Sequence, residues 1–363
     1  MRLSQLAQGR DNNFNLIRIA AAFTVLVTHS FALSGGAAAG APGRSRLGMS
    51  LGAIAVDVFF ATSGFLVTAS LMRRGSLRAF AWARALRIYP ANVVMVLITV
   101  FGLGLLFTTQ PWTEYLTSMM TLRYLERCAT LFFGVSFRLP GVFAHNPYPG
   151  AVNGSLWTLP YELHMYAILA FVWFLCTRFA SRNVHRTFKY TLVAVTAVSA
   201  VLLVLNDLYN PAPRENGFLM LLCTFFSGAV CFVLRERIVL SWSLFWPLAA
   251  LLAASCIDKH LFFAVYLATL AYLVLVLAYL PGGMLRRYNR VGDYSYGTYI
   301  YAFPVQQSVA ALVPGVSLAS MIALASVGTL ALAALSWHLV ERPALELKEA
   351  LSRARRPAYG RSA

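Results

Sequence analysis

Arg18 and His29 lie in one long apolar run, where ionisable side chains are rare because their burial in lipid is costly. They are eleven residues apart, which in a helix is about three turns and about 16 Å, so the two side chains share one face. An imidazole can take a proton from a hydroxyl or attack a thioester, and an arginine offers a fixed charge to an anionic or carbonyl group. Alone, Arg18 would suit an interfacial anchor and His29 a helix end, but their shared face predicts a catalytic pair.

Two carboxylates lie in other apolar runs. Asp57 stands near the start of its run, where it either accepts a hydrogen bond from a first-turn amide or orients His29. Glu162 lies one turn into a later run and shares a helix face with Tyr166, four residues on. Asp57 and Glu162 are therefore candidate catalytic groups, and Tyr166 is a candidate substrate contact.

Two further pairs have helical spacing. Arg84 and Arg87 are one turn apart in the basic segment 72–90, which suits either phosphate groups or a positively charged membrane anchor. Ser295 and Tyr299 share a face near the start of a late apolar run. We expect the arginine pair to bind a cofactor together with Arg18, and Ser295 and Tyr299 to contact substrate. No metal site is expected, because no metal-ligand spacing occurs.

The composition places these residues in a membrane protein. The 363 residues are 59% hydrophobic and only 12% charged, whereas about a quarter of a soluble domain is charged. Apolar runs long enough to cross about 30 Å of hydrocarbon recur along the chain, and in lipid each must be helical. The fold class predicted is an α-helical polytopic membrane protein of about ten transmembrane helices. The predicted spans are residues 16–35, 51–71, 91–109, 157–177, 190–206, 217–234, 242–256, 260–280, 294–313 and 318–340.

The net charge of +17 is explained by topology. With the N-terminus inside, 22 of the 30 Lys and Arg residues fall in inner segments and seven in outer ones, which predicts that both termini are cytoplasmic. Nucleic acid is therefore not an expected partner, while membrane lipid is. The spans use most of the chain, so 1–363 is predicted to be a single domain that ends in a basic cytoplasmic tail, 344–363. The long outer loop 110–156 is a candidate acceptor-binding or re-entrant element.

Taken together, the motifs resemble those of the acyltransferase-3 family of membrane proteins. No single motif is specific, but their order along nearly the whole chain is. The matching segments are Arg18 with ten residues before His29, Asp57-Val-Phe-Phe-x-x-Ser63-Gly64-Phe65, the arginine pair before Ile88-Tyr89-Pro90, Ser155-Leu-Trp-Thr-Leu-x-x-Glu162, Ser295-Tyr296-Gly297, and Glu341-Arg342-Pro343 at the end of the last span.

The resemblance implies an acyl donor, usually acetyl-CoA, that enters from the cytoplasm, and an acceptor hydroxyl on a saccharide or lipid-linked glycan. It implies that Arg18 and His29 are essential and that Arg84 and Arg87 face the donor. His29 would act as general base or form an acyl-histidine, and the sequence does not choose between them. The expected location is the cytoplasmic (inner) membrane. The alternatives are a transporter or exporter of a glycan or lipid intermediate, and a sensor in which the outer loop binds a ligand.

Overall fold

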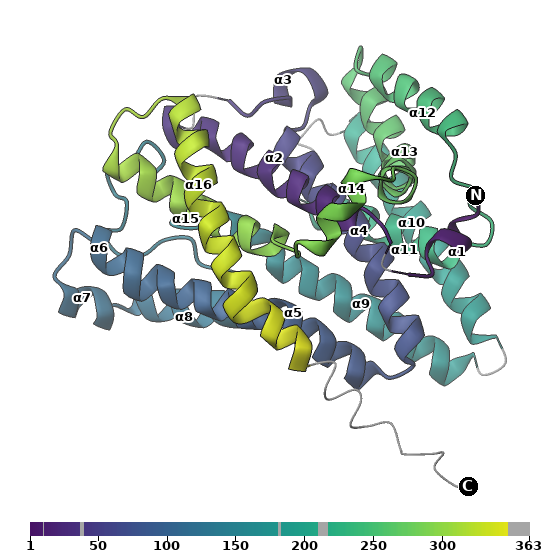
Figure 1. Cartoon of the computed structure of the whole chain (residues 1–363), viewed down its shortest axis with the longest axis horizontal. Helices are drawn as coiled ribbons and strands as arrows, with labels where there is room; N and C mark the ends of the chain where they lie inside the picture. The colour runs from purple at the N-terminus through teal and green to yellow at the C-terminus, as the bar shows by residue number, and fades with distance from the viewer. Residues whose placement is uncertain (10, 37–39, 181–182, 210–216, 348–363) are drawn as a thin grey trace, which may run out of the picture.

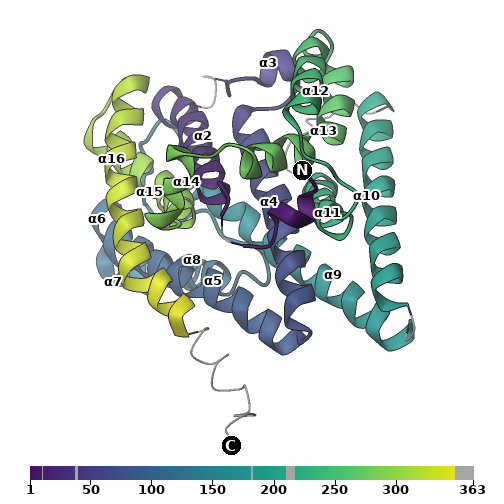
Figure 2. The ribbon, with the colours of Figure 1, turned by 45° about the vertical axis from the view of Figure 1, so that its right-hand side comes forward.

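The computed structural model describes residues 1–9, 11–36, 40–180, 183–209 and 217–347, and in these ranges the chain is helical with no strand. An isolated antiparallel bridge joins Arg2 to Val239. Figures 1 and 2 show the helices packed as one bundle, with α12 and α13 on the side away from α16. The helices are α1 (Leu3–Leu6), α2 (Phe14–Gly35), α3 (Arg44–Leu47), α4 (Leu51–Arg74), α5 (Leu77–Leu97), α6 (Leu105–Phe107), α7 (Trp112–Thr117), α8 (Met119–Thr130), α9 (Thr158–Phe179), α10 (Val184–Tyr209), α11 (Phe218–Val233), α12 (Trp242–Ser255), α13 (Lys259–Tyr279), α14 (Met284–Arg287), α15 (Ser295–Leu312) and α16 (Leu318–Ser336).

Within these described ranges, seven helices are long and apolar enough to cross a membrane. They contain α2, α4, α5, α9, α10, α13 and α16. The other three predicted spans correspond to α11 and α12, which are apolar but shorter, and to α15, an 18-residue helix with buried Gln306 and Gln307. The polytopic membrane class is confirmed, and the count of ten spans stays a prediction.

Two helices extend beyond their predicted spans. The helix that contains the span expected at 91–109 begins at Leu77, because the Ser76 hydroxyl accepts a hydrogen bond from the backbone N–H of Ala79 and starts a helix through the basic segment. This helix continues through the π-helical residues Ile98–Gly104 to Phe107. Arg84 and Arg87 therefore project from the first turns of this helix.

The last predicted span also lies within a longer helix. This helix runs from Leu318 to Leu347, so it continues past Pro343. The π-helical turn Trp337–Glu341 ends two residues before this proline, and such wide turns accommodate the backbone hydrogen bond that a proline cannot make. The first four residues of the predicted 344–363 tail are therefore helical, and 348–363 lie outside the described residues.

The central contact of the bundle is between α4 and α11, and it depends on two glycines. A Cβ atom on Gly64 would lie 1.8 Å from the carbonyl oxygen of Phe225, and one on Gly228 would lie 1.9 Å from that of Ala61. Small residues allow such close backbone approach, which drives helix association in lipid. The contact fixes the face of α4 that carries Phe60 and Ser63.

Replacement of Gly64 by valine is therefore expected to separate α4 from α11 and to destabilise the protein by about 3 kcal/mol, the upper range for overpacked cores. Thermal unfolding in a mild detergent should show a clearly lower midpoint and a smaller monodisperse fraction. Gly102→Val is the matched control, because a Cβ there would meet only a side-chain atom at 3.9 Å. Equal midpoints for the two variants would contradict this account of the packing.

Segments predicted to share a side of the membrane contact one another. On the predicted inner side, the backbone N–H of Leu3 donates to Ile238 at 2.9 Å and that of Asn13 donates to Ala278 at 2.8 Å. On the predicted outer side, the Gln307 amide donates to the carbonyl of Tyr148 at 2.8 Å. This agrees with the predicted alternation, while the assignment of one side to the cytoplasm stays a prediction from the arginine distribution.

The outer loop 110–156 folds back along α5. The Tyr115 hydroxyl donates to the carbonyl of Val100 at 3.0 Å, and the Asn92 amide donates to that of Cys128 at 2.7 Å. Helix α8 therefore lies beside α5, as both views show (Figures 1 and 2). The end of α8 thus lies beside the middle of α5, and the acceptor-binding or re-entrant role of this loop stays a prediction.

Candidate active site

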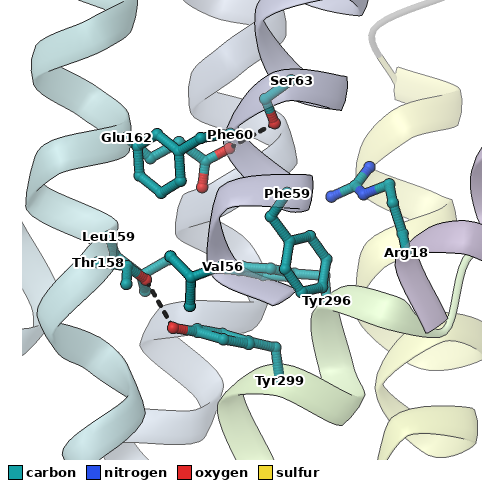
Figure 3. Close-up of a pocket in the computed structure, with 10 residues that line it drawn as sticks. All are labelled: Arg18, Val56, Phe59, Phe60, Ser63, Thr158, Leu159, Glu162, Tyr296 and Tyr299. Carbon is teal, nitrogen blue, oxygen red and sulfur yellow. Dashed lines mark hydrogen bonds between the residues drawn. The ribbon is translucent and has the colours of Figure 1, made fainter. Parts of the chain in front are cut away.

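A narrow cavity lies where α2, α4, α9 and α15 meet. We call it the Arg18 cavity. Figure 3 shows the Arg18 side chain extending from α2 toward the Phe59 ring, with Glu162 on the opposite wall. The lining residues are Arg18, Val56, Phe59, Phe60, Ser63, Thr158, Leu159, Glu162, Tyr296 and Tyr299.

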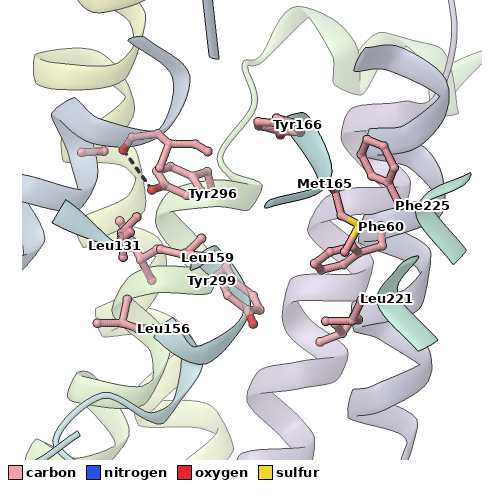
Figure 4. Close-up of a cluster of buried hydrophobic side chains, with 14 of the residues drawn as sticks. Phe60, Leu131, Leu156, Leu159, Met165, Tyr166, Leu221, Phe225, Tyr296 and Tyr299 are labelled. Atoms are coloured by element: carbon pink, nitrogen blue, oxygen red, sulfur yellow. Dashed lines mark hydrogen bonds between the residues drawn. The ribbon is translucent and has the colours of Figure 1, made fainter. Parts of the chain in front are cut away.

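A hydrophobic cluster surrounds this cavity and fixes its walls. Phe60 of α4, Met165 of α9 and Phe225 of α11 are buried on one side of it, while Leu159 and Tyr299 lie on the other (Figure 4). The Tyr296 hydroxyl donates to the carbonyl of Ile88 at 3.0 Å. Packed apolar walls of this kind hold the few polar groups in place and exclude water around them.

Arg18 belongs to a charge network at one end of the cavity. Its Nη1 lies 3.3 Å from Oδ2 of Asp293, the same oxygen that accepts a hydrogen bond from Arg87. Arg87 also lies 3.5 Å from the Glu341 carboxylate, which is buried and accepts a hydrogen bond from Ser336. Two arginines and two carboxylates from four distant segments thus form one compact cluster.

Asp293 is the centre of this network, and the sequence analysis did not identify it. Its side chain is only 12% exposed. Burial raises the pKa of this carboxyl, but the positive charges of Arg87 and Arg18 outweigh burial and bring the pKa to about 2. The backbone N–H and hydroxyl of Ser295 also donate to its Oδ1. An Asp two residues before a Ser at a helix start is a capping pattern that could have pointed to it.

Arg84 and Arg87 differ in their surroundings. Arg87 is bound to two carboxylates. In the part of the chain that the structure describes, Arg84 has no carboxylate partner; its guanidinium lies 5.8 Å from the Tyr166 ring centroid, and its Nε is buried without a hydrogen bond. Of the predicted phosphate-binding pair, Arg84 is therefore the one whose charge is available to a ligand.

Glu162 connects α9 to α4 across the cavity. Its Oε1 accepts hydrogen bonds from the Tyr166 hydroxyl and, at 3.5 Å, from the Ser63 hydroxyl (Figure 3). The predicted shared face of Glu162 and Tyr166 is confirmed by this hydrogen bond. Tyr166 lies between Glu162 and Arg84, so the three side chains form a continuous polar edge.

The two predicted contacts on α15 lie at different places. Tyr299 lines the Arg18 cavity, and its hydroxyl lies 2.8 Å from Oγ1 of Thr158. Ser295 is fully buried against Asp293 instead. The structure therefore gives Tyr299 a place in the cavity wall and gives Ser295 a role in holding Asp293.

His29 lines a second cavity of about 320 Å³, the His29 cavity. Its Nδ1 is buried without a hydrogen-bond partner, and its ring packs at 5.2 Å against Phe303 of α15. The lining residues are His29, Ala32, Leu33, Phe137, Tyr148, Gly150, Ala151, Gly154, Trp157 and Phe303. An imidazole that lines a cavity can accept a proton from a hydroxyl bound there.

The two cavities are neighbours along the same three helices. Trp157 lines one and Thr158 the other, and Tyr299 and Phe303, which line different cavities, are one turn apart in α15. On α2 the two cavities are separated by the three turns between Arg18 and His29. Arg18 and His29, which were predicted to share a face of α2, thus each line one of two adjacent cavities.

Asp57 lies away from both cavities. It is buried, and its Oδ2 accepts a hydrogen bond of 2.8 Å from the Tyr266 hydroxyl of α13. Asp57 therefore connects α4 to α13. Its predicted role in orienting His29 has no support in this contact.

Comparisons with known proteins agree with these features. A protein-family model described as an acyltransferase domain matches residues 11–338. The chain is 30% identical to an "O-acetyl transferase" of Shigella phage Sf6, over 92% of this chain and 96% of that protein. It is 32% identical to "Nodulation protein 10" of Rhizobium leguminosarum bv. viciae, over 95% of this chain and 96% of that protein. No solved structure is significantly similar to the chain.

Proposed function

The chain belongs to the acyltransferase-3 family and is a multi-pass membrane O-acyltransferase, and we propose that it moves an acetyl group from cytoplasmic acetyl-CoA to a hydroxyl of an extracytoplasmic or lipid-linked saccharide in the inner membrane. The observation that carries the proposal is the pair of adjacent cavities on α2, one with Arg18 and one with His29. A transporter or a sensor would not need this chemistry.

The donor occupies the Arg18 cavity in this proposal. Arg84 supplies an unpaired guanidinium for the phosphates of CoA near the predicted cytoplasmic end. The pantetheine arm lies along the apolar walls, where Glu162 accepts hydrogen bonds from its amide groups. Arg18, held by Asp293, interacts with the thioester carbonyl, and the acyl group extends toward the His29 cavity.

The acceptor hydroxyl binds in the His29 cavity. As general base, His29 takes the hydroxyl proton while the oxygen bonds to the acyl carbon; the carbon–sulfur bond then breaks, and the proton passes to the leaving thiolate. Alternatively, His29 attacks the thioester carbon and the carbon–sulfur bond breaks as CoA thiolate leaves; the acceptor oxygen then takes the acyl group from the imidazole, and its proton passes to the thiolate. Both routes need an imidazole that borders the acceptor site, and His29 lines this cavity.

The test uses the purified protein in lipid nanodiscs with radiolabelled acetyl-CoA and a panel of neutral and anionic saccharides. The proposal expects acceptor-dependent release of CoA thiol and a labelled, alkali-sensitive ester on the saccharide. Use of a donor other than a CoA thioester, or of an acceptor without a saccharide hydroxyl, would contradict it.

Replacement of Arg84 by glutamine is expected to raise the KM for acetyl-CoA about ten- to a hundredfold, because a hydrogen bond to a charged group contributes about 1.5–3 kcal/mol. Steady-state kinetics at saturating acceptor measure it. Arg186→Gln is the matched control, since Arg186 also lies over a tyrosine ring, that of Tyr190, but far from the cavities on α10. If Arg84→Gln changed kcat alone, the phosphate role would be lost.

A further inference from the structure

A groove lined by three arginines lies between α8 and the segment that follows it, with an open volume of about 1240 Å³. We call it the arginine groove. Arg123 and Arg127 are one turn apart on the exposed face of α8, and Arg138 comes from the returning segment. The lining residues are Ser118, Met120, Arg123, Arg127, Val135, Ser136, Phe137, Arg138 and Gly150.

The charges of this groove are not neutralised by the protein. None of its lining residues is acidic. Within the described ranges, Arg123, Arg127 and Arg138 make no ion pair. Their guanidinium groups make one hydrogen bond there, from Nε of Arg138 to the carbonyl of Gly150 at 3.4 Å. Glu126, although adjacent to Arg127 in sequence, does not line the groove. Three unpaired guanidinium groups around one open space form a site for an anion.

The depth of the groove makes these arginines unusual. Helix α8 packs beside α5, where the carbonyl of Cys128 accepts a hydrogen bond from the Asn92 amide. Arg127, next to Cys128, thus lies alongside the part of α5 near Asn92, which belongs to a predicted span. Arginines at the depth of a span are costly, and such residues mark polar pathways or binding sites.

The arginine groove and the His29 cavity share a wall. Phe137 and Gly150 line both spaces. The Phe137 side chain is 38% exposed, and the backbone N–H of Val152 donates to its carbonyl at 2.7 Å, so the backbone of this wall is fixed while the ring faces open space. A ligand bound to the arginines would therefore lie next to His29, on the other side of one aromatic ring.

We infer that the arginine groove binds an anionic group of the acceptor, a phosphate or a carboxylate, while a hydroxyl of the same molecule passes Phe137 to reach His29. The inference rests on the proposed function and specifies its acceptor as an anionic saccharide. The anion is either the phosphate that joins a glycan to a lipid or the carboxylate of an acidic sugar, since guanidinium groups bind both.

Equilibrium binding to the protein in nanodiscs tests this without turnover. Three probes with the same chain are compared: octyl glucosyl phosphate, octyl glucuronide and the neutral octyl glucoside. The wild type is expected to bind at least one anionic probe at least tenfold more tightly than the neutral one, and the preferred probe identifies the source of the anion. Equal affinity for all three would overturn the inference.

The double variant Arg123→Gln/Arg127→Gln is expected to bind the preferred anionic probe about ten- to a hundredfold more weakly and the neutral probe unchanged. Arg186→Gln/Lys189→Gln removes two charges from α10 at positions that line neither the groove nor the two cavities, and it should change neither affinity. If the double variant does not fold, Arg138→Gln, at an exposed position, replaces it with an expected loss of about tenfold. Wild-type affinity in a folded variant would overturn the inference.

The same probes separate this inference from the proposed function. Selective, arginine-dependent binding without acetyl transfer to any probe would contradict the proposed function and support the anion site. The opposite result has two parts: the double variant transfers acetyl to the neutral probe with wild-type kinetics, and the wild type binds all three probes equally. This result would support the proposed function and reject the anion site.

Discussion

Acyl transfer by the His29→Ala variant is expected to be about 10²- to 10⁴-fold slower than by the wild type, because a positioned general base contributes that much. The KM for acetyl-CoA should stay within about threefold, since the imidazole lines the His29 cavity and not the Arg18 cavity. Single-turnover kinetics with labelled acetyl-CoA would separate the chemical step from donor binding.

His164→Ala is the control for this substitution. His164 is exposed on α9, and among the described residues its ring contacts that of Tyr161; it lines neither cavity, so its loss should leave the rate unchanged. Incubation of the wild type with labelled donor alone also distinguishes the two routes: label on the protein that is absent from His29→Ala indicates an acyl-histidine, whereas unlabelled protein indicates direct transfer. A variant His29→Ala with the wild-type rate would remove His29 from the mechanism.

Replacement of Asp293 by asparagine is expected to have the largest effect on stability. It would leave Arg18 and Arg87, both less than a fifth exposed, close together without the carboxylate that pairs them. Removal of one partner from a buried ion pair costs about 3–5 kcal/mol. We expect a lower unfolding midpoint and a slower chemical step, because Arg18 would no longer be held at the cavity wall.

A double-mutant cycle with Arg18→Gln tests this coupling directly. The two substitutions should together destabilise the protein by less than their sum, because each removes the same ion pair. Asp11→Asn, which removes a mostly exposed partner of Arg286, should have little effect. Additive effects of Asp293→Asn and Arg18→Gln would contradict the network.

The same network predicts a dependence of stability on pH. The pKa of Asp293 is about 2 in the folded protein, against an ordinary value of 3.8. A carboxyl whose pKa is lowered by folding stabilises the folded state above its unfolded pKa and loses this contribution as the pH falls through its folded pKa. Between about pH 4 and pH 2, the free energy of unfolding of the wild type should therefore fall. That of Asp293→Asn, which lacks this carboxyl, should fall less.

Local patterns predicted the membrane class and several side-chain relations. The recurrence of long apolar runs indicated a helical membrane protein, and the four-residue spacing of Glu162 and Tyr166 indicated a contact that the structure contains. The three-turn spacing of Arg18 and His29 placed them on one face of α2. These features depend on residues near one another in the chain, where helical geometry alone fixes the relation.

Features that depend on distant residues could not be predicted in this way. Asp293 pairs with Arg87 across 206 positions, and Asp57 binds Tyr266 across 209. Nothing in the local pattern near Asp57 distinguishes a partner on α13 from one on α2. The start of α5 was missed for a different reason: a run of arginines resembles a solvent-exposed loop, yet arginine is a good helix former.

Sidedness is the most direct test of the account. Sealed inverted membrane vesicles expose the cytoplasmic face, and neither acetyl-CoA nor a hydrophilic anionic saccharide crosses their bilayer. With labelled acetyl-CoA outside and the saccharide enclosed in the lumen, the two adjacent cavities predict labelled ester in the lumen, and none with His29→Ala. Ester formation only when donor and acceptor are on the same side would contradict transfer between the Arg18 and His29 cavities.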